Sequence, residues 1–413
     1  MRILIFEQRY TSPKEAGIGR FYYLAEEWAR AGHEIIIVAG MINYISGKKI
    51  DKYKRKLWVK EKEADNFYIL RVFDSSIGYR NFLGRLWSYI SYLISAFFAG
   101  IFCPADVVIA SSPPIFVGFL GWLASFLKGS RFIFEVRDLW PDEPIELGFL
   151  KNKILIDFSL RLEKFLYRRS AAIVANSPGI KEYISRVKKI DLGKITTVPN
   201  PVSLKLIDIS RAEEIKEKFG WNDKFIILYS GSMAAVYDFE IVLEAAKEFS
   251  ESSVIFAFVG SGRQREFLKN KAEKLGLKNV KFYDSMPKSE VYSMMAAADI
   301  GIISLRKDIK LLRYVYASKA LDYMAAGIPI VAAVEGVNDE LICEKAQAGI
   351  CVNPGEKNKF ISAIKKFYEN KELRRSAGES GREYIGNYFG SSVLAGEYLE
   401  VLKQTNNRAK ATK

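Results

Sequence analysis

The sequence contains a single histidine in 413 residues, and this scarcity excludes several kinds of catalytic site. His33 lies in the turn "RAGHEI", between a predicted helix and a predicted strand, where we expect a structural role. Serine–histidine triads, histidine-ligated metal centres and histidine general bases are therefore not expected. Any chemistry must rest on carboxylates, lysines, arginines and backbone groups.

Cysteine is also scarce, and its three positions show no metal-ligand spacing. Cys103, Cys343 and Cys351 cannot all pair with one another, so we expect inert thiols in a reducing, cytosolic compartment. The sequence has no Asp-x-Asp pair either, and no metal site is predicted. The first apolar run ends at Glu7, which indicates a buried strand rather than a signal peptide.

Charge is nearly absent from one long stretch, although the chain as a whole carries +14. Residues 86–127 contain a single charged side chain, Asp106, whereas residues 47–63 are dense in lysine. Two buried helices packed on a sheet would explain the apolar stretch. We favour helices that lie partly in the surface of a bilayer, beside the basic segment, because Trp and Tyr suit that interface. For the basic segment alone, a solvated loop is the alternative.

What the sequence does contain is an alternation of strand and helix patterns. Hydrophobic residues make up 49% and charged residues 27%, which is typical of a globular protein too long for one core. Apolar strands alternate with amphipathic helices in both halves of the chain, and residues 196–203 form the best linker candidate with their two prolines. The predicted fold class is α/β, with two Rossmann-like domains whose parallel sheets face a central cleft.

The segment 314–331, "YVYASKALDYMAAGIPIV", predicts a helix with an unusual start. Ser318 would be its N-cap, and Lys319 in the first turn opposes the helix dipole unless an anion binds there. Asp322 lies one turn further on the same face. The pattern suits a nucleoside diphosphate and its ribose, while a surface helix with scattered charge is the alternative.

Other candidate positions lie in glycine-rich loops and at strand ends. Glycines after strands allow a backbone to approach a phosphate or a sugar, and cations nearby would add charge. Charged residues at the end of a parallel strand belong to a crevice, or else form a solvated turn. The glycines are Gly17, Gly19, Gly231 and Gly262; the cations are Lys310, Arg313 and Arg263; the strand-end segment is "EVRDLWPDEP", residues 135–144.

These motifs occur in an order that resembles family 4 glycosyltransferases. They are "RAGHEI", "EVRDLWPDEP", "SPGIKEYI", "VPNPV", "YSGS", "VGSGRQREFL" and "SKALDYMAAGIPIV". More narrowly, they resemble the members that build O-antigen, capsule and other lipid-linked glycans. The resemblance covers nearly the whole chain and implies the GT-B fold. It divides the chain into an acceptor-side domain (1–198), a nucleotide-sugar domain (199–387) and a C-terminal helix that crosses back (388–413).

The resemblance also implies roles for particular residues. Asp322 stands where the family has a ribose-binding Glu, and Ser318 and Lys319 open the helix that faces the diphosphate. Gly17 and Gly19 match a loop near the diphosphate and sugar. Catalytic roles beside the transferred sugar fall to Arg137 and Asp138, with Lys319 on the leaving diphosphate. Gly231, Gly262, Arg263 and Arg313 complete the implied donor site.

The chain departs from the family pattern at three places, so its recognition of the donor sugar must differ from the family's. Tyr314 stands where the family has the first Glu of a two-glutamate motif. Ser232 and Tyr237 fall near the usual diphosphate-binding Arg and Lys. Lys319, Arg313 or Arg263 would then bind the diphosphate in place of that Arg and Lys.

The resemblance therefore implies a retaining hexosyltransferase that uses a UDP-sugar without a metal or other cofactor. The expected acceptor is a polyprenyl-diphosphate-linked glycan, and the expected location is the inner face of the cell membrane, as a peripheral cytoplasmic protein. A nucleotide-sugar epimerase of the same fold and a non-enzymatic membrane-surface binding protein remain alternatives. Nucleic acid is not an expected partner, because the basic residues would have to line one continuous face.

Overall fold

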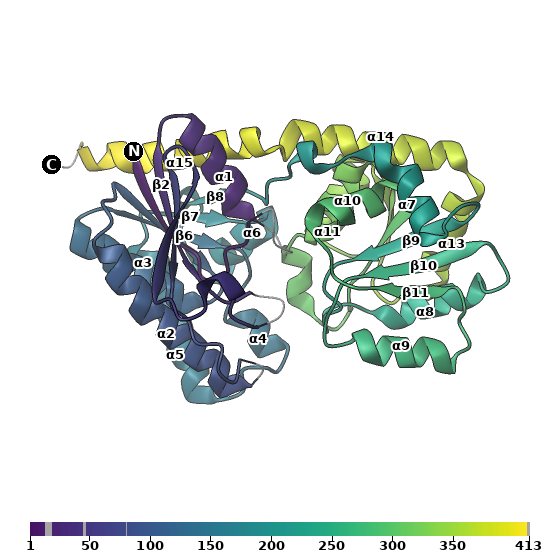
Figure 1. Ribbon diagram of the computed structural model, residues 1–413, viewed down its shortest axis with the longest axis horizontal. Helices are drawn as coiled ribbons and strands as arrows, with labels where there is room; N and C mark the ends of the chain where they lie inside the picture. The colour runs from purple at the N-terminus through teal and green to yellow at the C-terminus, as the bar shows by residue number, and fades with distance from the viewer. Residues whose placement is uncertain (13–18, 44–46, 80, 411–413) are drawn as a thin grey trace. The chain divides into compact units, whose positions relative to one another are not determined.

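The computed structural model describes residues 1–12, 19–43, 47–79 and 81–410 (Figure 1). The chain forms two compact units that divide between Pro201 and Val202. Unit 1 also includes the last helix, which starts at Ser391, and unit 2 extends to Gly390. Each unit is an α/β domain built on a sheet of parallel strands.

Unit 1 has an eight-stranded sheet in the order β3-β4-β2-β1-β5-β6-β7-β8, parallel except for the β3–β4 pair. Its strands are β1 (Arg2–Phe6), β2 (Glu34–Gly40), β3 (Trp58–Ala64), β4 (Phe67–Val72), β5 (Val107–Ser112), β6 (Arg131–Val136), β7 (Ala172–Ala175) and β8 (Ile195–Thr197). Its helices are α1 (Arg20–Arg30), η1 (Asp51–Tyr53), α2 (Phe82–Ile101), α3 (Ile115–Lys128), α4 (Asp142–Glu146), α5 (Lys153–Arg169), α6 (Pro178–Arg186), η2 (Leu192–Lys194) and α15 (Ser391–Lys410).

Unit 2 has a six-stranded sheet in the order β11-β10-β9-β12-β13-β14. Its strands are β9 (Phe225–Ser230), β10 (Val254–Val259), β11 (Val280–Tyr283), β12 (Ile300–Ser304), β13 (Ile330–Ala333) and β14 (Gly349–Val352). Its helices are η3 (Leu204–Leu206), η4 (Ile209–Arg211), α7 (Ala212–Phe219), α8 (Phe239–Glu248), α9 (Arg265–Lys274), α10 (Lys288–Ala296), η5 (Lys310–Tyr314), α11 (Ser318–Ala326), α12 (Val337–Asp339), η6 (Glu340–Lys345), α13 (Lys357–Glu369) and α14 (Lys371–Tyr388).

The central strands are buried on both faces, as their unbroken apolar runs predict. All six residues of β9 and of β5 are buried. A parallel strand covered on both faces needs no polar alternation, which is why these segments read as continuous apolar runs. The six strands β4-β2-β1-β5-β6-β7 of unit 1 follow the same order as the six strands of unit 2, which places a topological switch point between β1 and β5, and another between β9 and β12.

The last helix packs against the first helix of unit 1. The rings of Phe21 and Trp28 on α1 contact the ring of Tyr398 on α15, at centroid distances of 6.3 and 5.2 Å. The indole of Trp28 donates a hydrogen bond to the Ala395 carbonyl at 2.9 Å. These three aromatic side chains are buried, so their apolar area holds α15 in unit 1.

The basic segment 47–63 is not simply a solvated loop. Its second half forms β3, an antiparallel strand at the edge of the sheet. Its side chains alternate weakly between exposed and half-buried, and lysines line the exposed side. Charged side chains on an edge strand discourage pairing with another chain, which gives the lysines a structural use as well.

The apolar stretch 86–127 forms most of α2, all of β5 and nearly all of α3. Helices α2, α3 and α5 are neighbours along one side of unit 1, and each contacts the sheet (Figure 1). Their sheet-facing residues, such as Tyr92 and Ala96 on α2, are buried. Packing on the sheet therefore accounts for only one face of each helix.

Candidate functional site

The site begins at the switch point of unit 2, where β9 and β12 run side by side. Gly231 follows β9, and the chain then turns so that Tyr237 forms an antiparallel bridge with Leu305, just after β12. Open α/β sheets bind ligands at this position, beyond the carboxyl ends of the strands. The residues predicted to bind a donor lie around this point.

Glycines after β9 and β10 allow two loops to touch through their backbones. A Cβ atom on Gly260 would lie 2.2 Å from the Gly231 carbonyl oxygen, and one on Gly262 would lie 2.5 Å from the Met233 carbonyl oxygen. All three glycines have positive φ, between 124° and 153°. Gly231 and Gly262 were predicted as ligand contacts. Gly262 has a packing reason of its own, whereas Gly231 is favoured by its positive φ, since a Cβ there would lie 3.7 Å from the Lys319 side chain.

Helix α11 begins at Ser318, but Ser318 is not its N-cap. The N-cap is Ala317, and no side chain on the helix caps it. The buried side chain of Asn338 holds the segment just before the helix: its Oδ1 accepts from the Ala317 N–H at 2.7 Å, and its Nδ2 donates to the Val315 carbonyl at 2.9 Å. The predicted N-cap role of Ser318 is therefore wrong, because the helix begins at Ser318 itself, one residue earlier than predicted.

Lys319 is a buried cation in the first turn of α11. Its Nζ lies 3.6 Å from the centre of the Tyr237 ring and 4.6 Å from that of Tyr229, and 3.4 Å from the Tyr229 hydroxyl. The stem of the side chain passes 3.7 Å from the position of a Cβ on Gly231. Burial lowers the pKa of Lys319 from 10.5 to about 7, against the opposing charge of Asp322. No carboxylate of the described chain forms an ion pair with it.

Asp322, one turn further along α11, is held by two residues of α10. Both of its carboxylate oxygens lie 2.9 Å from the Lys288 Nζ, and the Tyr292 hydroxyl donates to Oδ1 at 2.8 Å. The Asp322 and Lys288 side chains are only 16% and 17% exposed. Asp322 is thus already engaged in the free protein, which the sequence did not indicate.

The other predicted cations lie further out. Arg263 and Arg313 are exposed at the surface of unit 2. The backbone of Arg313 instead packs against Gly336, where a Cβ would lie 2.3 Å from the Arg313 carbonyl oxygen. The structure therefore brings Gly231, Lys319 and Asp322 together, and leaves these two arginines at the surface.

In unit 1, the ends of β1 and β6 bring together Glu7 and Arg137. The Arg137 guanidinium forms a 2.9 Å ion pair with Oε1 of Glu7. Oε2 of Glu7 is buried and has no hydrogen-bond partner among the described residues. Burial raises the pKa of Glu7 to about 7, while the Arg137 charge opposes the shift. Glu7 was noted only as the end of an apolar run.

Asp138 and Glu143 form a second acidic pair just after β6. Burial raises the pKa of Asp138. Burial also raises the pKa of Glu143 to about 8, with a smaller contribution from the charge of Asp138. Two carboxyl groups whose ionisation is disfavoured at one strand end are typical of a functional site, although structural clusters show the same shifts.

Two further positions from the strand-end and glycine motifs, Glu135 and Gly19, have clear structural roles. Glu135 forms a fully buried ion pair with Arg20 at 2.8 Å, and Arg20 also donates to the Val198 carbonyl, so this pair ties α1 to β6 and to the chain after β8. Gly19 is the N-cap of α1, and a Cβ there would lie 2.8 Å from the Thr11 carbonyl oxygen. Gly17 lies outside the described residues.

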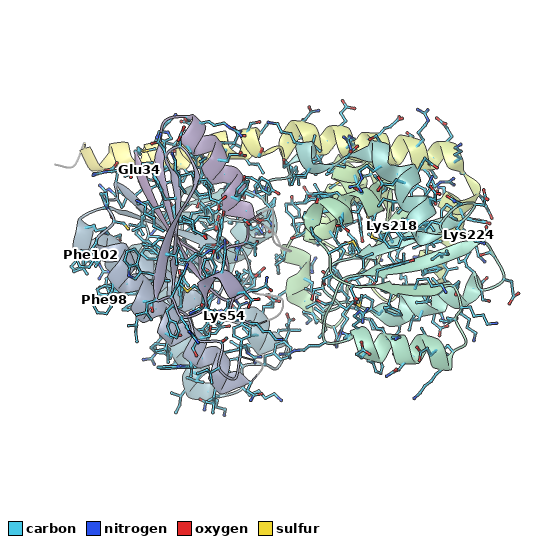
Figure 2. The ribbon with its side chains drawn as sticks, in the orientation of Figure 1. Glu34, Lys54, Phe98, Phe102, Lys218 and Lys224 are labelled. Carbon is cyan, nitrogen blue, oxygen red and sulfur yellow. A yellow bond between two sulfur atoms is a disulfide. The ribbon has the colours of Figure 1, made fainter. Side chains whose placement is uncertain are left out.

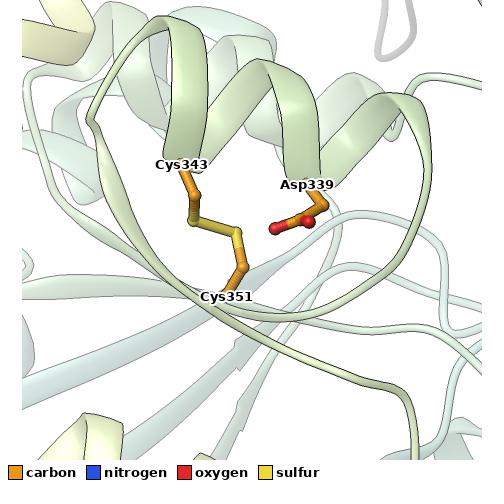
Figure 3. Close-up of side chains that lie close together, drawn as sticks. All are labelled: Asp339, Cys343 and Cys351. Carbon is orange, nitrogen blue, oxygen red and sulfur yellow. A yellow bond between two sulfur atoms is a disulfide. The ribbon is translucent and has the colours of Figure 1, made fainter.

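The cysteines differ from the prediction of inert thiols. Cys343 on η6 and Cys351 on β14 form a disulfide, and Cys103 is a free, partly buried thiol (Figure 3). The prediction failed because the spacing of eight residues hides a helix-to-strand return that places the two side chains together. Asp339 lies beside the disulfide, within 4.8 Å of both sulfurs. Sulfurs joined in this way do not offer the thiolates that a metal would need.

The outer face of unit 1 is unusually apolar. Exposed side chains follow α2 at helical spacing, and α3 and α5 add more; Figure 2 shows Phe98 and Phe102 on this unit. Along α2 and just after it they are Leu83, Trp87, Ile90, Ile94, Phe98 and Phe102; on α3 and α5 they are Phe119, Phe126, Leu127, Ile154, Leu155 and Phe158. No described helix is both long and apolar enough to cross a membrane.

The sequence did not identify Lys288, Tyr292 or Asn338 as parts of the site. Lys288 and Tyr292 lie 30 or more residues from Asp322 and meet it only because α10 packs on α11. Asn338 follows a glycine with φ of 67° after β13, and a strand-end "EGVND" turn is the one signal that could have pointed to it. Tyr237 was noted only as a departure from a family pattern.

Two family models match the chain, one for each unit. Residues 17–201 match the "Glycosyl transferase 4-like domain", and residues 211–384 match "Glycosyl transferases group 1". Among curated relatives, the colanic acid biosynthesis glycosyl transferase WcaI of Escherichia coli (strain K12) is 24% identical over 379 residues, which cover 88% of this chain and 91% of WcaI. The lipopolysaccharide core biosynthesis glycosyltransferase LpsE of Rhizobium meliloti is 24% identical over 65% of this chain and 75% of its own.

Solved structures resemble the whole chain at low identity. Sucrose-phosphate synthase of Thermosynechococcus elongatus superimposes with a TM-score of 0.77 at 16% identity, covering 98% of each chain. HepE of Anabaena, solved with UDP-glucose, gives 0.73 at 16% identity over 98% of this chain and 100% of its own. WaaG, a glycosyltransferase of lipopolysaccharide biosynthesis, gives 0.67 at 17% identity over 96% and 98%. These likenesses confirm the predicted fold.

Proposed function

The chain is a glycosyltransferase with the GT-B fold, as predicted from its sequence, and we propose that it transfers a hexose from a UDP-sugar with retention of configuration. The proposed acceptor is a polyprenyl-diphosphate-linked glycan, used at the cytoplasmic face of the cell membrane. Relatives named for colanic acid and lipopolysaccharide core biosynthesis support an envelope glycan as the product. The UDP complexes of HepE support the choice of nucleotide.

The observation that carries this proposal is the buried amine of Lys319. A cation that is removed from water and lacks a carboxylate partner is costly, so the free site disfavours its charge. A diphosphate placed against Gly231 and the first turn of α11 would supply the missing anion. The positive end of the α11 dipole would attract the diphosphate from the same side.

In this proposal, the chemistry requires no side-chain nucleophile. The bond between the sugar C1 and the UDP oxygen breaks while the acceptor hydroxyl oxygen forms a new bond to C1, and negative charge grows on the leaving diphosphate. Lys319 and the start of α11 stabilise that charge in a site that excludes water. The leaving phosphate takes the proton of the acceptor hydroxyl, so no histidine is needed. We assign Arg137 and Asp138 to the neighbourhood of the transferred sugar, as the family resemblance implies.

The proposed location rests on the apolar face of α2, α3 and α5. Phe98 and Phe102 are 61% and 84% exposed. Contact between these rings and water is unfavourable, whereas burial at the boundary of headgroups and acyl chains in a bilayer would stabilise them. Exposed lysines lie on or just before α5, among them Lys151, Lys153 and Lys164. Trp58 adds an exposed aromatic ring to the lysine-rich β3. An anionic lipid surface matches both features.

A binding and product assay tests the proposed function. The melting temperature of the protein is measured with UDP-, GDP-, ADP- and dTDP-sugars, and UDP-sugars are expected to raise it most. The product formed from that donor on a polyprenyl-diphosphate-linked glycan is then analysed by NMR. Retention of the anomeric configuration is expected. An inverted product, or no shift with any nucleotide sugar, would contradict the proposal.

A further inference from the structure

The pair formed by Asp322 and Lys288 changes what the α11 carboxylate can offer to a nucleotide. A carboxylate accepts about four hydrogen bonds on its two oxygens. Three of these places are already taken, since Oδ1 accepts from Lys288 and from the Tyr292 hydroxyl and Oδ2 accepts from Lys288. Asp322 therefore has room for one further donor, on Oδ2, and cannot accept two ribose hydroxyls without losing Lys288.

Lys288 has the complementary capacity. Its ammonium group carries three N–H donors, and because its Nζ lies 2.9 Å from both oxygens of Asp322, one N–H is shared between those oxygens. The other two N–H groups are left for other acceptors. Lys288 is the first residue of α10, and its side chain is 17% exposed, so a small polar ligand can reach it. One acceptor place and one donor thus lie next to each other.

This arrangement fits the two neighbouring hydroxyls of a ribose, one donating and one accepting. We propose that Lys288 is a specificity-determining residue that binds one ribose hydroxyl of the donor while Asp322 binds the other, so that the site selects ribonucleoside diphosphate sugars over 2′-deoxy donors such as dTDP-sugars. The inference rests on the proposed function, because it assumes that the nucleotide lies over α11. The family resemblance implies neither a role for Lys288 nor a selection of ribonucleotide donors over 2′-deoxy donors.

In the competing interpretation, Lys288 blocks Asp322, and the ribose must displace Lys288 before it can bind that carboxylate. Displacement would leave a partly buried ammonium without its partner, and Tyr292, whose ring centre lies 5.0 Å from the Lys288 Nζ, would lose that contact too. Because Asp322 is one methylene shorter than Glu, it has less reach past a bound lysine. The two interpretations predict opposite effects of removing Lys288, which makes them separable.

The test uses isothermal calorimetry on the full chain with UDP, 2′-deoxy-UDP and 3′-deoxy-UDP as probes. In the parent, each missing hydroxyl should weaken binding by at least about tenfold. Lys288→Met should weaken UDP binding by a similar factor and abolish the penalty for one of the two deoxy nucleotides. Asp322→Asn should reduce the penalty for the other one. Lys288→Arg should restore part of the discrimination.

Controls separate folding from recognition. Lys278→Met removes an exposed lysine of the same unit and should leave all three affinities unchanged. Melting temperatures of the Lys288 variants show whether they are folded. Tighter UDP binding by Lys288→Met would show that Lys288 blocks Asp322 and would overturn the inference. Unchanged penalties for both deoxy nucleotides would also overturn it. Failure of the parent to bind UDP at all would instead overturn the proposed function.

Discussion

Lys319 is the residue in which burial, charge and function are most closely linked. The sequence predicted a cation at the start of a helix, and this placement is correct because helix punctuation is local. Its burial between Tyr229 and Tyr237 could not be predicted, since those rings come from a strand and a loop about 80 to 90 residues earlier. The same limit applies to Lys288 and Tyr292, which reach Asp322 only through packing of α10 on α11.

The lowered pKa of Lys319 makes donor binding depend on pH. With a pKa of about 7, the amine is largely neutral at pH 8 in the free protein, and a bound diphosphate raises the pKa again. Binding therefore takes up a proton above pH 7, and affinity should fall as pH rises. We expect the Kd for UDP to increase by up to about tenfold per pH unit between pH 7.5 and 9.

Calorimetry in buffers of different ionisation enthalpy measures this proton uptake directly. Lys319→Met should remove it and flatten the pH profile. A parent profile that is already flat across the same range would show that Lys319 does not change its charge on binding.

At the scale of helices and strands, the sequence predicted most of the long elements and missed the short ones. Apolar runs identified the buried parallel strands, because burial on both faces removes any need for alternation. The strands β3, β4, β8 and β14 were not predicted; lysine masks β3, and β8 and β14 are only three and four residues long. The π-helical turn at η6, and with it the disulfide, has no periodic signature.

The exposed stripe of α2 predicts membrane binding that can be removed by mutation. Phe98→Asp together with Phe102→Asp should reduce co-sedimentation with vesicles of anionic phospholipid by at least tenfold, because each exposed ring contributes up to about 1.5–3 kcal/mol when buried. High salt should weaken binding further, since each lysine near an anionic surface contributes about 1 kcal/mol.

A matched control exists on the other unit. Phe267 on α9 is 59% exposed, close to the 61% of Phe98, yet it lies outside the apolar face. Phe267→Asp should leave vesicle binding unchanged. Equal losses in both variants would indicate a general effect of the substitution, and full solubility of the parent beside anionic vesicles would refute the proposed location.

At the scale of the whole molecule, the two units carry different kinds of chemistry. Unit 2 holds a cation beside a helix start, whereas unit 1 holds the Glu7–Arg137 pair and the raised pKa values of Asp138 and Glu143. The division into two α/β units was predictable from the repeated strand–helix pattern. The role of Glu7 was not, because an acid at the end of a first strand has many possible uses.

Transfer activity should survive removal of divalent metal. The sequence has no Asp-x-Asp pair, and the proposed charge neutralisation relies on Lys319 and the start of α11. Activity measured after dialysis against EDTA should therefore stay within about twofold of the untreated enzyme, which is smaller than the loss of any single catalytic interaction. Loss of activity that manganese restores would show that a metal carries the charge instead.

The most direct test of the account is turnover by Lys319→Ala. UDP release from the UDP-sugar is measured with a polyprenyl-diphosphate-linked acceptor, alongside donor affinity and folding of the variant. Because charge on the diphosphate grows in the transition state, kcat should fall by about 10²–10³ while donor affinity changes less. A folded Lys319→Ala enzyme that turns over as fast as the parent would contradict the assignment of the buried amine to the leaving diphosphate.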